Sequence, residues 1–183
     1  MGIIGFVIIG VVVIVLIPVF WWIGTSNGFK RKAIKIDEAL SGVEVALTKR
    51  YDMLTKLLDV AKGYAKHERQ LFTKVVEMRR GMSVGELSSA IGQTDALATR
   101  LFAVAEGYPE LRSSENFKEL QSGIRDAEEH LQAARRLYNS TTTAYNTAIV
   151  VFPSSIVANS MHLKKREFFA AEEAKRADVV MKF

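Results

Sequence analysis

The chain begins with the uncharged run IIGFVIIGVVVIVLIPVFWWI, residues 3–23, which decides its fold class. A helix of about 21 residues is about 32 Å long at a rise of 1.5 Å per residue, which matches the ~30 Å hydrocarbon core of a bilayer. Such a helix satisfies its backbone polar groups internally and is therefore stable in lipid. Trp21 and Trp22 close the run, where indole rings favour the membrane interface. The run predicts an N-terminal transmembrane helix.

The residues that flank this run predict its orientation. Only the amino terminus precedes it, and the basic residues Lys30, Arg31, Lys32 and Lys35 follow it. Because positive flanks stay on the cytoplasmic side, we expect the N-terminus outside and the bulk of the chain in the cytoplasm, at the bacterial inner membrane. The same cations can bind anionic headgroups, at about 1 kcal/mol each, or can serve only to set the topology.

A signal peptide and a lipid anchor both fit this run less well. A cleaved signal peptide has a positive n-region, a shorter apolar stretch and a small-residue cleavage site, and these features are missing. A lipid anchor is also disfavoured, because Gly2 is not followed by the required Ser or Thr and the chain has no cysteine to acylate. The run is therefore interpreted as a permanent anchor.

Composition narrows the class of the remaining residues. The 183-residue chain has 25 Lys+Arg, 20 Asp+Glu, 3 prolines and no cysteine. The charges alternate in sign, which is typical of solvated helix faces and gives no basic domain for nucleic acid. Few helix breakers favour an all-α fold: a transmembrane helix followed by a long antiparallel helical bundle with coiled-coil-like seams. We expect an anchor at 1–28, a cytoplasmic bundle at 29–171 and a tail at 172–183.

Residues 30–80 predict one long helix. Their apolar residues recur in steps of three and four, as in a heptad seam. The seam consists of Ile36, Leu40, Val43, Leu47, Leu54, Leu57, Ala61, Tyr64, Leu71, Val75 and Met78. Arg50 and Glu68 interrupt it, and a charge on a seam is costly unless it is paired. The favoured interpretation places both at the bundle edge with their charges in water, and the alternative is a register-setting or partner-facing polar site.

A second helix is expected from Ser83 to Gly107. Ser83 and Glu86 have the spacing of a capping box. Gly107 suits a left-handed position at the C-terminal end, and Pro109 pushes Tyr108 towards extended geometry.

A third helix has the clearest period. Its seam runs through Phe117, Leu120, Ile124, Ala127, Leu131, Ala134, Tyr138, Thr141, Tyr145, Ala148 and Phe152. The pairs Tyr138-Asn139, Tyr145-Asn146 and Phe152-Pro153 are spaced one heptad apart. This pattern predicts a buried aromatic ladder, with the asparagines bonding across helices. Pro153 is expected to begin a shorter fourth helix, since a residue without an N–H fits a first turn.

The first half of the long helix predicts self-assembly. If the second helix turns back only a short way and the third runs outward again, nothing in the chain covers the seam residues Ile36, Leu40, Val43 and Leu47. An uncovered apolar stripe is unfavourable by about 1.5–3 kcal/mol per large side chain. A neighbouring copy held in the same membrane is the simplest cover, although a different membrane protein is an alternative, as is a break in the helix near Thr48.

No catalytic pattern is found in the sequence. His67, His130 and His162 lack both the His-Glu-x-x-His and the Glu-x-x-His spacing, and no Walker or glycine-rich loop occurs. We therefore expect no enzyme activity, no cofactor and no metal.

Short blocks of residues follow one another in a characteristic order along the chain: Lys49-Arg50-Tyr51-Asp52, Gly63-Tyr64-Ala65, Tyr108-Pro109, Asn116-Phe117, Tyr138-Asn139, Tyr145-Asn146 and Phe152-Pro153. In these blocks, and over nearly its whole length, the chain resembles the LemA family of bacterial membrane proteins. Thr55-Lys56 stands where the family usually has proline and asparagine, so we expect a less kinked helix there.

The resemblance implies a membrane-anchored cytoplasmic bundle and no known activity. Members of the family are associated with envelope maintenance and are often encoded beside a heat-shock-type membrane zinc metalloprotease, and a divergent branch shapes magnetosome membranes. The first hypothesis is therefore an oligomeric, non-catalytic scaffold that recruits or regulates an integral membrane partner such as that protease. The alternative is an anionic-lipid-binding or membrane-shaping protein.

Overall fold

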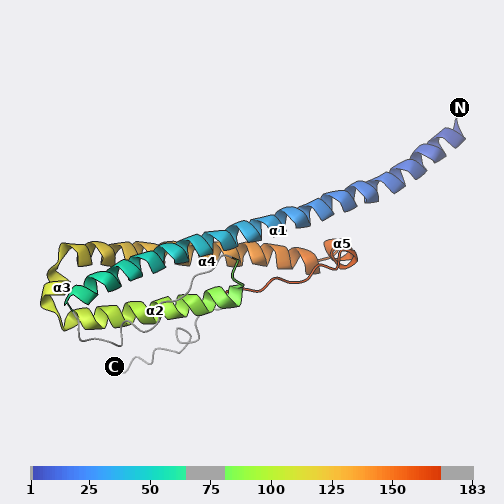
Figure 1. Ribbon diagram of the computed structural model, residues 1–183. Coiled ribbons are helices and arrows are strands. Elements are labelled where there is room, and N and C mark those ends of the chain that lie inside the picture. The colour runs from blue at the N-terminus through green and yellow to red at the C-terminus, as the bar shows by residue number, and fades with distance from the viewer. Residues whose placement is uncertain (1, 65–80, 170–183) are drawn as a thin grey trace, which may run out of the picture. The chain divides into compact units, whose positions relative to one another are not determined.

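The computed structural model describes residues 2–64 and 81–169, which are mostly helical with no strand among them (Figure 1). The expected all-α fold with a long apolar N-terminal helix and a helical bundle is confirmed. The helices are α1 (Ile3–Tyr64), α2 (Val84–Glu106), α3 (Pro109–Ser113), α4 (Glu115–Val150) and α5 (Ser154–Ser160). Of the predicted long helix, residues 65–80, with Glu68, His67 and the last seam positions, lie outside the described residues.

The chain divides into two compact units. Unit 1 comprises Met1–Glu38 and Ser140–Glu167, and unit 2 comprises Ala39–Asn139 and Phe168–Phe183. Both α1 and α4 contribute to each unit. The expected boundaries after residues 28 and 171 stay predictions, although the first of them falls inside the continuous helix α1.

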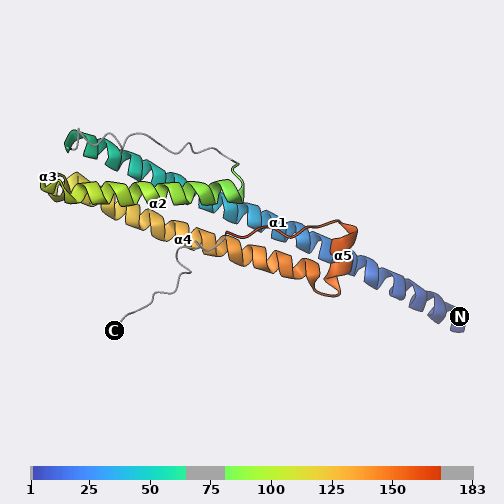
Figure 2. The same cartoon turned by 90° about the horizontal axis from the view of Figure 1, so that it is seen from below.

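Unit 2 is built from α2, α3 and parts of α1 and α4. Within it α2 runs in the same direction as α1, and α4 runs in the opposite direction (Figures 1 and 2). The expectation that the second helix turns back along the first is therefore wrong, and α4 is the antiparallel partner of α1. The core residues come from all four helices: Leu54, Leu57, Leu58, Ala61, Leu97, Ala98, Leu101, Ala105, Leu111, Phe117 and Ile124.

The ends of α2 follow from local chemistry. Ser83 accepts a hydrogen bond from the Glu86 N–H while the Glu86 carboxylate accepts one from the Ser83 N–H, so the predicted capping box is confirmed. At the other end Gly107 has a right-handed φ of −78°, and the expected left-handed geometry is wrong. Its N–H bonds the Val104 carbonyl, and the chain enters α3 two residues later with Pro109 in the first turn.

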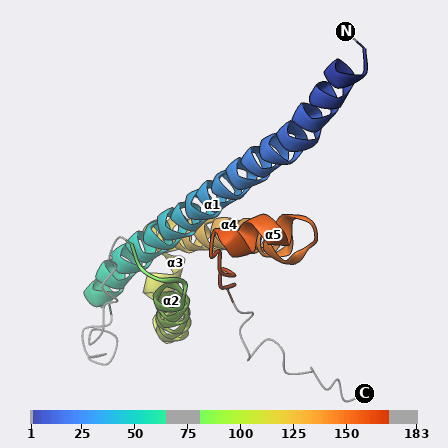
Figure 3. The ribbon, with the colours of Figure 1, turned by 90° about the vertical axis from the view of Figure 1, so that its right-hand side faces the viewer.

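Unit 1 contains α5, the first part of α1 and the last part of α4. In this unit α5 turns across the end of α4 (Figures 2 and 3). Val157 and Ala158 of α5 are buried. The Ser26 hydroxyl of α1 donates a hydrogen bond of 3.3 Å to the Met161 sulfur just after α5. Residues 24–28 lie inside the continuous helix α1. Through Ser26 this part of α1 contacts the chain that follows α5.

Candidate functional site

The apolar N-terminal part of α1 has the properties of a membrane segment. An 18-residue window of this helix has a mean hydropathy of 1.7, and only 6% of the window is buried within the protein. By length and composition the helix can cross a membrane. Trp21 and Trp22, which were predicted to lie at the interface, are both exposed.

Basic side chains line a groove in unit 1. Arg31, Lys32 and Lys35 come from α1, and they face Ser140 and Thr141 of α4 across a hollow of about 340 Å³. The α1 residues share one helix face because steps of three and four residues follow the helical period. Of the predicted interface cations, Lys30 is exposed but does not line this groove. The groove joins positive charges to hydroxyl groups, a combination that suits an anionic group.

The residues predicted to drive self-association are covered by the chain itself. Ile36, Val43 and Leu47 are almost completely buried, and Leu40 is partly buried. The premise that nothing folds over this half of the helix is wrong. The physical reason is the length and direction of α4, whose 36 residues span about 54 Å and run antiparallel to α1 (Figure 1). The burial of these residues removes the reason given for self-association through this stripe, and self-association itself stays a prediction.

In unit 2 the interruption of the seam at Arg50 is a buried ion cluster. Arg50 is 4% exposed and forms salt bridges with Asp95 of α2 and with Glu128 of α4, the latter at 3.1 Å. It also donates a 3.2 Å hydrogen bond to the Thr94 hydroxyl, which in turn donates to the Ile91 carbonyl. One guanidinium thus joins three helices, because its fork of donors can serve several acceptors at once.

The favoured interpretation of Arg50, an extended side chain at the bundle edge, is therefore wrong. The alternative of a register-setting polar site fits the structure, since the pairing requires Asp95 and Glu128 at one level of the bundle. Both carboxylates remain about one-third exposed, so water still reaches the acidic side of the cluster. The sequence signal for this ion cluster was an arginine at a seam position. The carboxylates that pair with Arg50 lie on other helices, so the sequence pattern could not identify them.

The two tyrosine–asparagine pairs hold the chain that returns after α5. In unit 1 the Asn146 amide donates to the Arg166 carbonyl at 2.9 Å and accepts from the Arg166 N–H at 2.8 Å. In unit 2 Asn139 makes the same pair of bonds with Phe169, at 3.1 and 2.9 Å. The asparagines were expected to bond across helices, whereas these four bonds join them to the backbone of a non-helical segment.

The spacing of these pairs has a simple geometric reason. Seven helical residues rise about 10.5 Å, and three extended residues span about 10 Å. A heptad repeat on α4 therefore matches every third residue of an extended chain. Tyr138 and Tyr145 are buried beside the asparagines, and Tyr138 packs edge-to-face on Phe169 at 5.0 Å between ring centroids.

The aromatic ladder ends sooner than its sequence period predicts. Phe152 is 77% exposed and Pro153 is also exposed, so the expected third buried aromatic is wrong. The reason is that α4 ends at Val150, and the helical period has no meaning beyond that point. Tyr64, at the end of the described part of α1, is likewise exposed rather than part of a buried seam.

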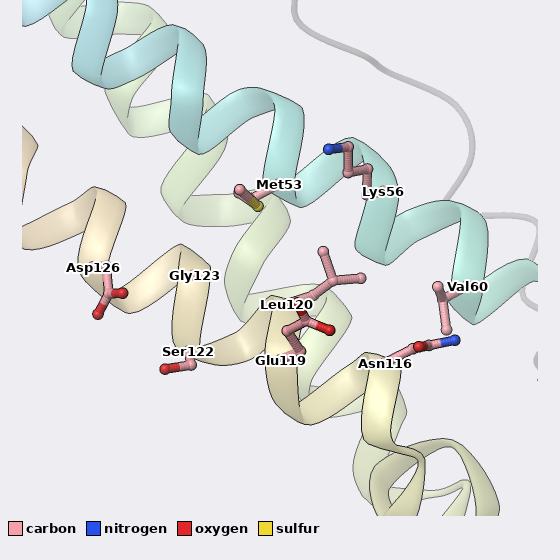
Figure 4. Close-up of a pocket in the computed structure, with 9 residues that line it drawn as sticks. All are labelled: Met53, Lys56, Val60, Asn116, Glu119, Leu120, Ser122, Gly123 and Asp126. Carbon is pink, nitrogen blue, oxygen red and sulfur yellow. The ribbon is translucent and has the colours of Figure 1, made fainter.

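The remaining residues of the family blocks lie in unit 2. Phe117 is buried and packs edge-to-face on Phe102 at 6.4 Å, and Tyr108 packs against the core. Tyr51 is partly buried. Asn116 lines an open groove of about 540 Å³ between α1 and α4, where Met53 and Leu120 meet the acidic Glu119 and Asp126 (Figure 4).

These sites show no convergent catalytic set. Among residues 2–64 and 81–169, no group of three or more His, Asp or Glu side chains is placed to hold a metal ion. Of the histidines there, His130 is exposed and contacts the Asp126 carbonyl at 2.7 Å, and His162 is exposed.

An apolar N-terminal helix that continues into a helical bundle defines a class of membrane-associated bundle proteins. The sequence model of the LemA family matches residues 39–183, and the chain belongs to that family. It is 27% identical to Protein LemA of Metamycoplasma hominis, over 87% of this chain and 75% of that protein. The resemblance inferred from the sequence blocks is thereby confirmed.

Magnetosome proteins are also similar to this chain. Magnetosome protein MamQ 2 of Paramagnetospirillum magneticum is 24% identical over 73% of this chain and 60% of its own length. Magnetosome protein MamQ of Magnetospirillum gryphiswaldense is 29% identical over 41% of this chain and 28% of its own length. The chain thus spans less than two thirds of the length of these magnetosome proteins.

Proposed function

We propose that this protein is a membrane-anchored, non-catalytic helical scaffold at the bacterial inner membrane. Its bundle lies on the cytoplasmic side and recruits or regulates an integral membrane partner. The observation that carries the proposal is the double use of α1. Its apolar residues 12–23 are exposed, whereas Val43, Leu47 and Leu54 of the same helix are fully buried in the bundle. One helix therefore serves as the membrane segment and as a structural element of the bundle, with no linker sequence between them.

Charge supports the orientation of this scaffold. Lys30, Arg31 and Lys35 are exposed directly after the apolar segment, and such cations favour the cytoplasmic side. The family resemblance makes a heat-shock-type membrane zinc metalloprotease the first candidate partner, in envelope maintenance.

Purification of the full chain in mild detergent tests the recruitment. We expect an integral membrane protein to co-purify at a fixed ratio. A matched control carries an unrelated apolar helix in place of residues 3–23: the partner is retained if the bundle recruits it and is lost if the anchor does. The purification is repeated after crosslinking in membranes, which retains weakly bound partners. If both preparations contain only this chain, the scaffold proposal is contradicted.

Assembly of several copies would have to use a surface other than the buried stripe. Val45 is exposed on α1, and the chain has no native cysteine. A Val45→Cys variant oxidised in native membranes should therefore form disulfide-linked dimers if copies meet along this face. A matching Val43→Cys variant should not, because that side chain is buried.

The basic groove favours a second candidate function, the binding of anionic lipid. Three cations near the surface contribute about 1 kcal/mol each to headgroup binding. Changing Arg31, Lys32 and Lys35 together to Gln should weaken binding by about 3 kcal/mol, which is roughly a hundredfold. Native mass spectrometry of the full chain with phosphatidylglycerol or phosphatidylcholine measures this loss.

The control for that experiment is a set of cations outside the groove. Lys118→Gln, Arg125→Gln and Arg136→Gln remove the same charge from exposed positions of α4. Equal binding of the two lipids by the natural chain, or equal losses in both sets of variants, contradicts a headgroup site in the groove.

A further inference from the structure

The corner between α4 and α5 in unit 1 exposes an apolar surface. Phe152 is 77% exposed, and Val150, Val151 and Ile156 are exposed beside it. A tight corner in water usually carries polar turn residues. Here residues 150–156, which we term the apolar corner, instead present large aliphatic and aromatic groups. A cluster of large exposed apolar residues in one short segment typically marks an interaction surface.

The apolar corner is held in place by contacts on both sides. The Ser154 hydroxyl donates to the Ala148 carbonyl at 2.6 Å and lies 2.9 Å from the Val151 carbonyl, so it caps the end of α4. Buried Val157 and Ala158 pack α5 into unit 1. The corner is therefore a defined feature of the fold, and its outward side chains are not needed to close the core.

The attachment of α5 to α1 sets the level of the corner along the anchor. Met161 accepts the 3.3 Å hydrogen bond from Ser26, and Ser26 follows Trp22 by four residues. At 1.5 Å per residue this is about 6 Å along the helix. Tryptophan rings at the end of an apolar span mark the membrane interface. The chain around α5 therefore lies at the level of the headgroups of the leaflet in which the anchor ends.

The residues after the corner suit the same level. Lys164, Lys165 and Arg166 are exposed, and they follow α5 within unit 1. Apolar groups beside cations are the chemistry of a surface that lies in a bilayer interface, with rings in the acyl boundary and charges among anionic headgroups. The end of the apolar segment of α1 has the same character, since Phe20 and Ile23 are also exposed apolar residues.

We propose that the apolar corner is a second membrane contact, which inserts Phe152 and its neighbours into the acyl boundary of the leaflet that holds the C-terminal end of the anchor. The occupant of this surface is the lipid bilayer. The inference rests on the anchor in the proposed function, and it is independent of whether the bundle recruits a partner. Contact at two places restricts the tilt of unit 1 on the membrane in a way that one helix does not.

Spin labels at single cysteines test the depth of the corner. The full cysteine-free chain is reconstituted in phosphatidylglycerol-containing vesicles with Phe152→Cys, and the accessibility of the nitroxide to oxygen and to a water-soluble nickel chelate is compared. Ile17→Cys provides the reference within the anchor, and Lys118→Cys, exposed on α4, provides the reference in water. We expect an oxygen-to-nickel ratio at Phe152 several-fold above that at Lys118 and below that at Ile17, because the acyl boundary is shallower than the middle of the anchor.

A ratio at Phe152 equal to that at Lys118 overturns the inference. Val151→Cys repeats the measurement in case Phe152→Cys perturbs the corner, and both sites must be water-exposed or both lipid-exposed. Strong spin–spin broadening that disappears on dilution with unlabelled chain would show a second copy at the corner and would also overturn it. Retention of the variants in carbonate-washed membranes shows that the anchor is intact, so this failure is distinguishable from failure of the anchor itself.

Discussion

The two units of the molecule treat charge and apolar surface in opposite ways. Unit 2 buries Arg50, whose guanidinium joins three helices, and it also contains an apolar core. Unit 1 exposes Phe152 and the apolar residues 12–23 of α1, and three of its cations, Arg31, Lys32 and Lys35, line an open groove. Apolar side chains are favoured inside a protein in water and can be exposed in lipid, so the contrast supports the proposal that unit 1 contacts a membrane.

The largest expected effect comes from breaking the ion cluster of unit 2. Arg50→Ala leaves Asp95 and Glu128 close together without their cation and removes a buried side chain, at a cost of about 3–5 kcal/mol. Denaturant unfolding of the full chain in detergent, followed by circular dichroism, measures this loss. Lys49→Ala, at the exposed neighbouring position, should leave the stability unchanged. An equally small effect of both substitutions would show that the cluster does not hold the helices in register.

A comparable loss is expected in unit 1 from its buried aromatic. Tyr145 is almost fully buried, so Tyr145→Ala should cost about 3–5 kcal/mol, as for a large aromatic removed from a core. Phe152→Ala in the same unit should cost much less in detergent, because the Phe152 ring packs little within the protein. Similar losses for the two variants would contradict the difference in burial between these aromatics.

The asparagine clamps give a smaller, paired effect. Each of Asn139→Ala and Asn146→Ala removes two hydrogen bonds to the backbone of the returning chain and leaves its polar groups unpaired, at about 1–3 kcal/mol. Hydrogen exchange at Phe169 should rise in the first variant and exchange at Arg166 in the second. If neither amide exchanges faster, the returning chain is held by other contacts.

The smallest effect is expected at the start of α2. Ser83→Ala removes the acceptor for the Glu86 N–H and should cost about 1 kcal/mol. Ser83→Asn retains a capping side chain and is the matched control. A loss for Ser83→Asn equal to that for Ser83→Ala would contradict a capping role.

Features with a local cause were predictable from the sequence. The long apolar N-terminal helix follows from an uncharged run, the seam burial of Leu54 and Leu57 follows from steps of three and four, and the capping box follows from the spacing of Ser83 and Glu86. Each depends on residues within one helix or one turn. The family blocks added the overall architecture.

Features that depend on distant residues were not predictable in this way. Arg50 finds its carboxylates on α2 and α4, and the asparagines find their partners in the chain after α5. The hydrophobic period of α2 predicts a helix and its buried face. It contains no information on whether α2 runs parallel or antiparallel to α1. Phe152 follows the heptad period of α4 in sequence, but α4 ends before it at Val150. The period therefore predicted a buried ring, and the Phe152 ring is exposed.

Site-directed labelling in spheroplasts tests the central claim most directly, namely that α1 anchors a cytoplasmic bundle in the inner membrane. Lys118→Cys places one thiol on the exposed face of α4, and a membrane-impermeant maleimide then reports the side on which it lies. We expect the chain to stay in carbonate-washed membranes and to be labelled only after lysis. Labelling of intact spheroplasts, or release of the chain by carbonate, would contradict the claim.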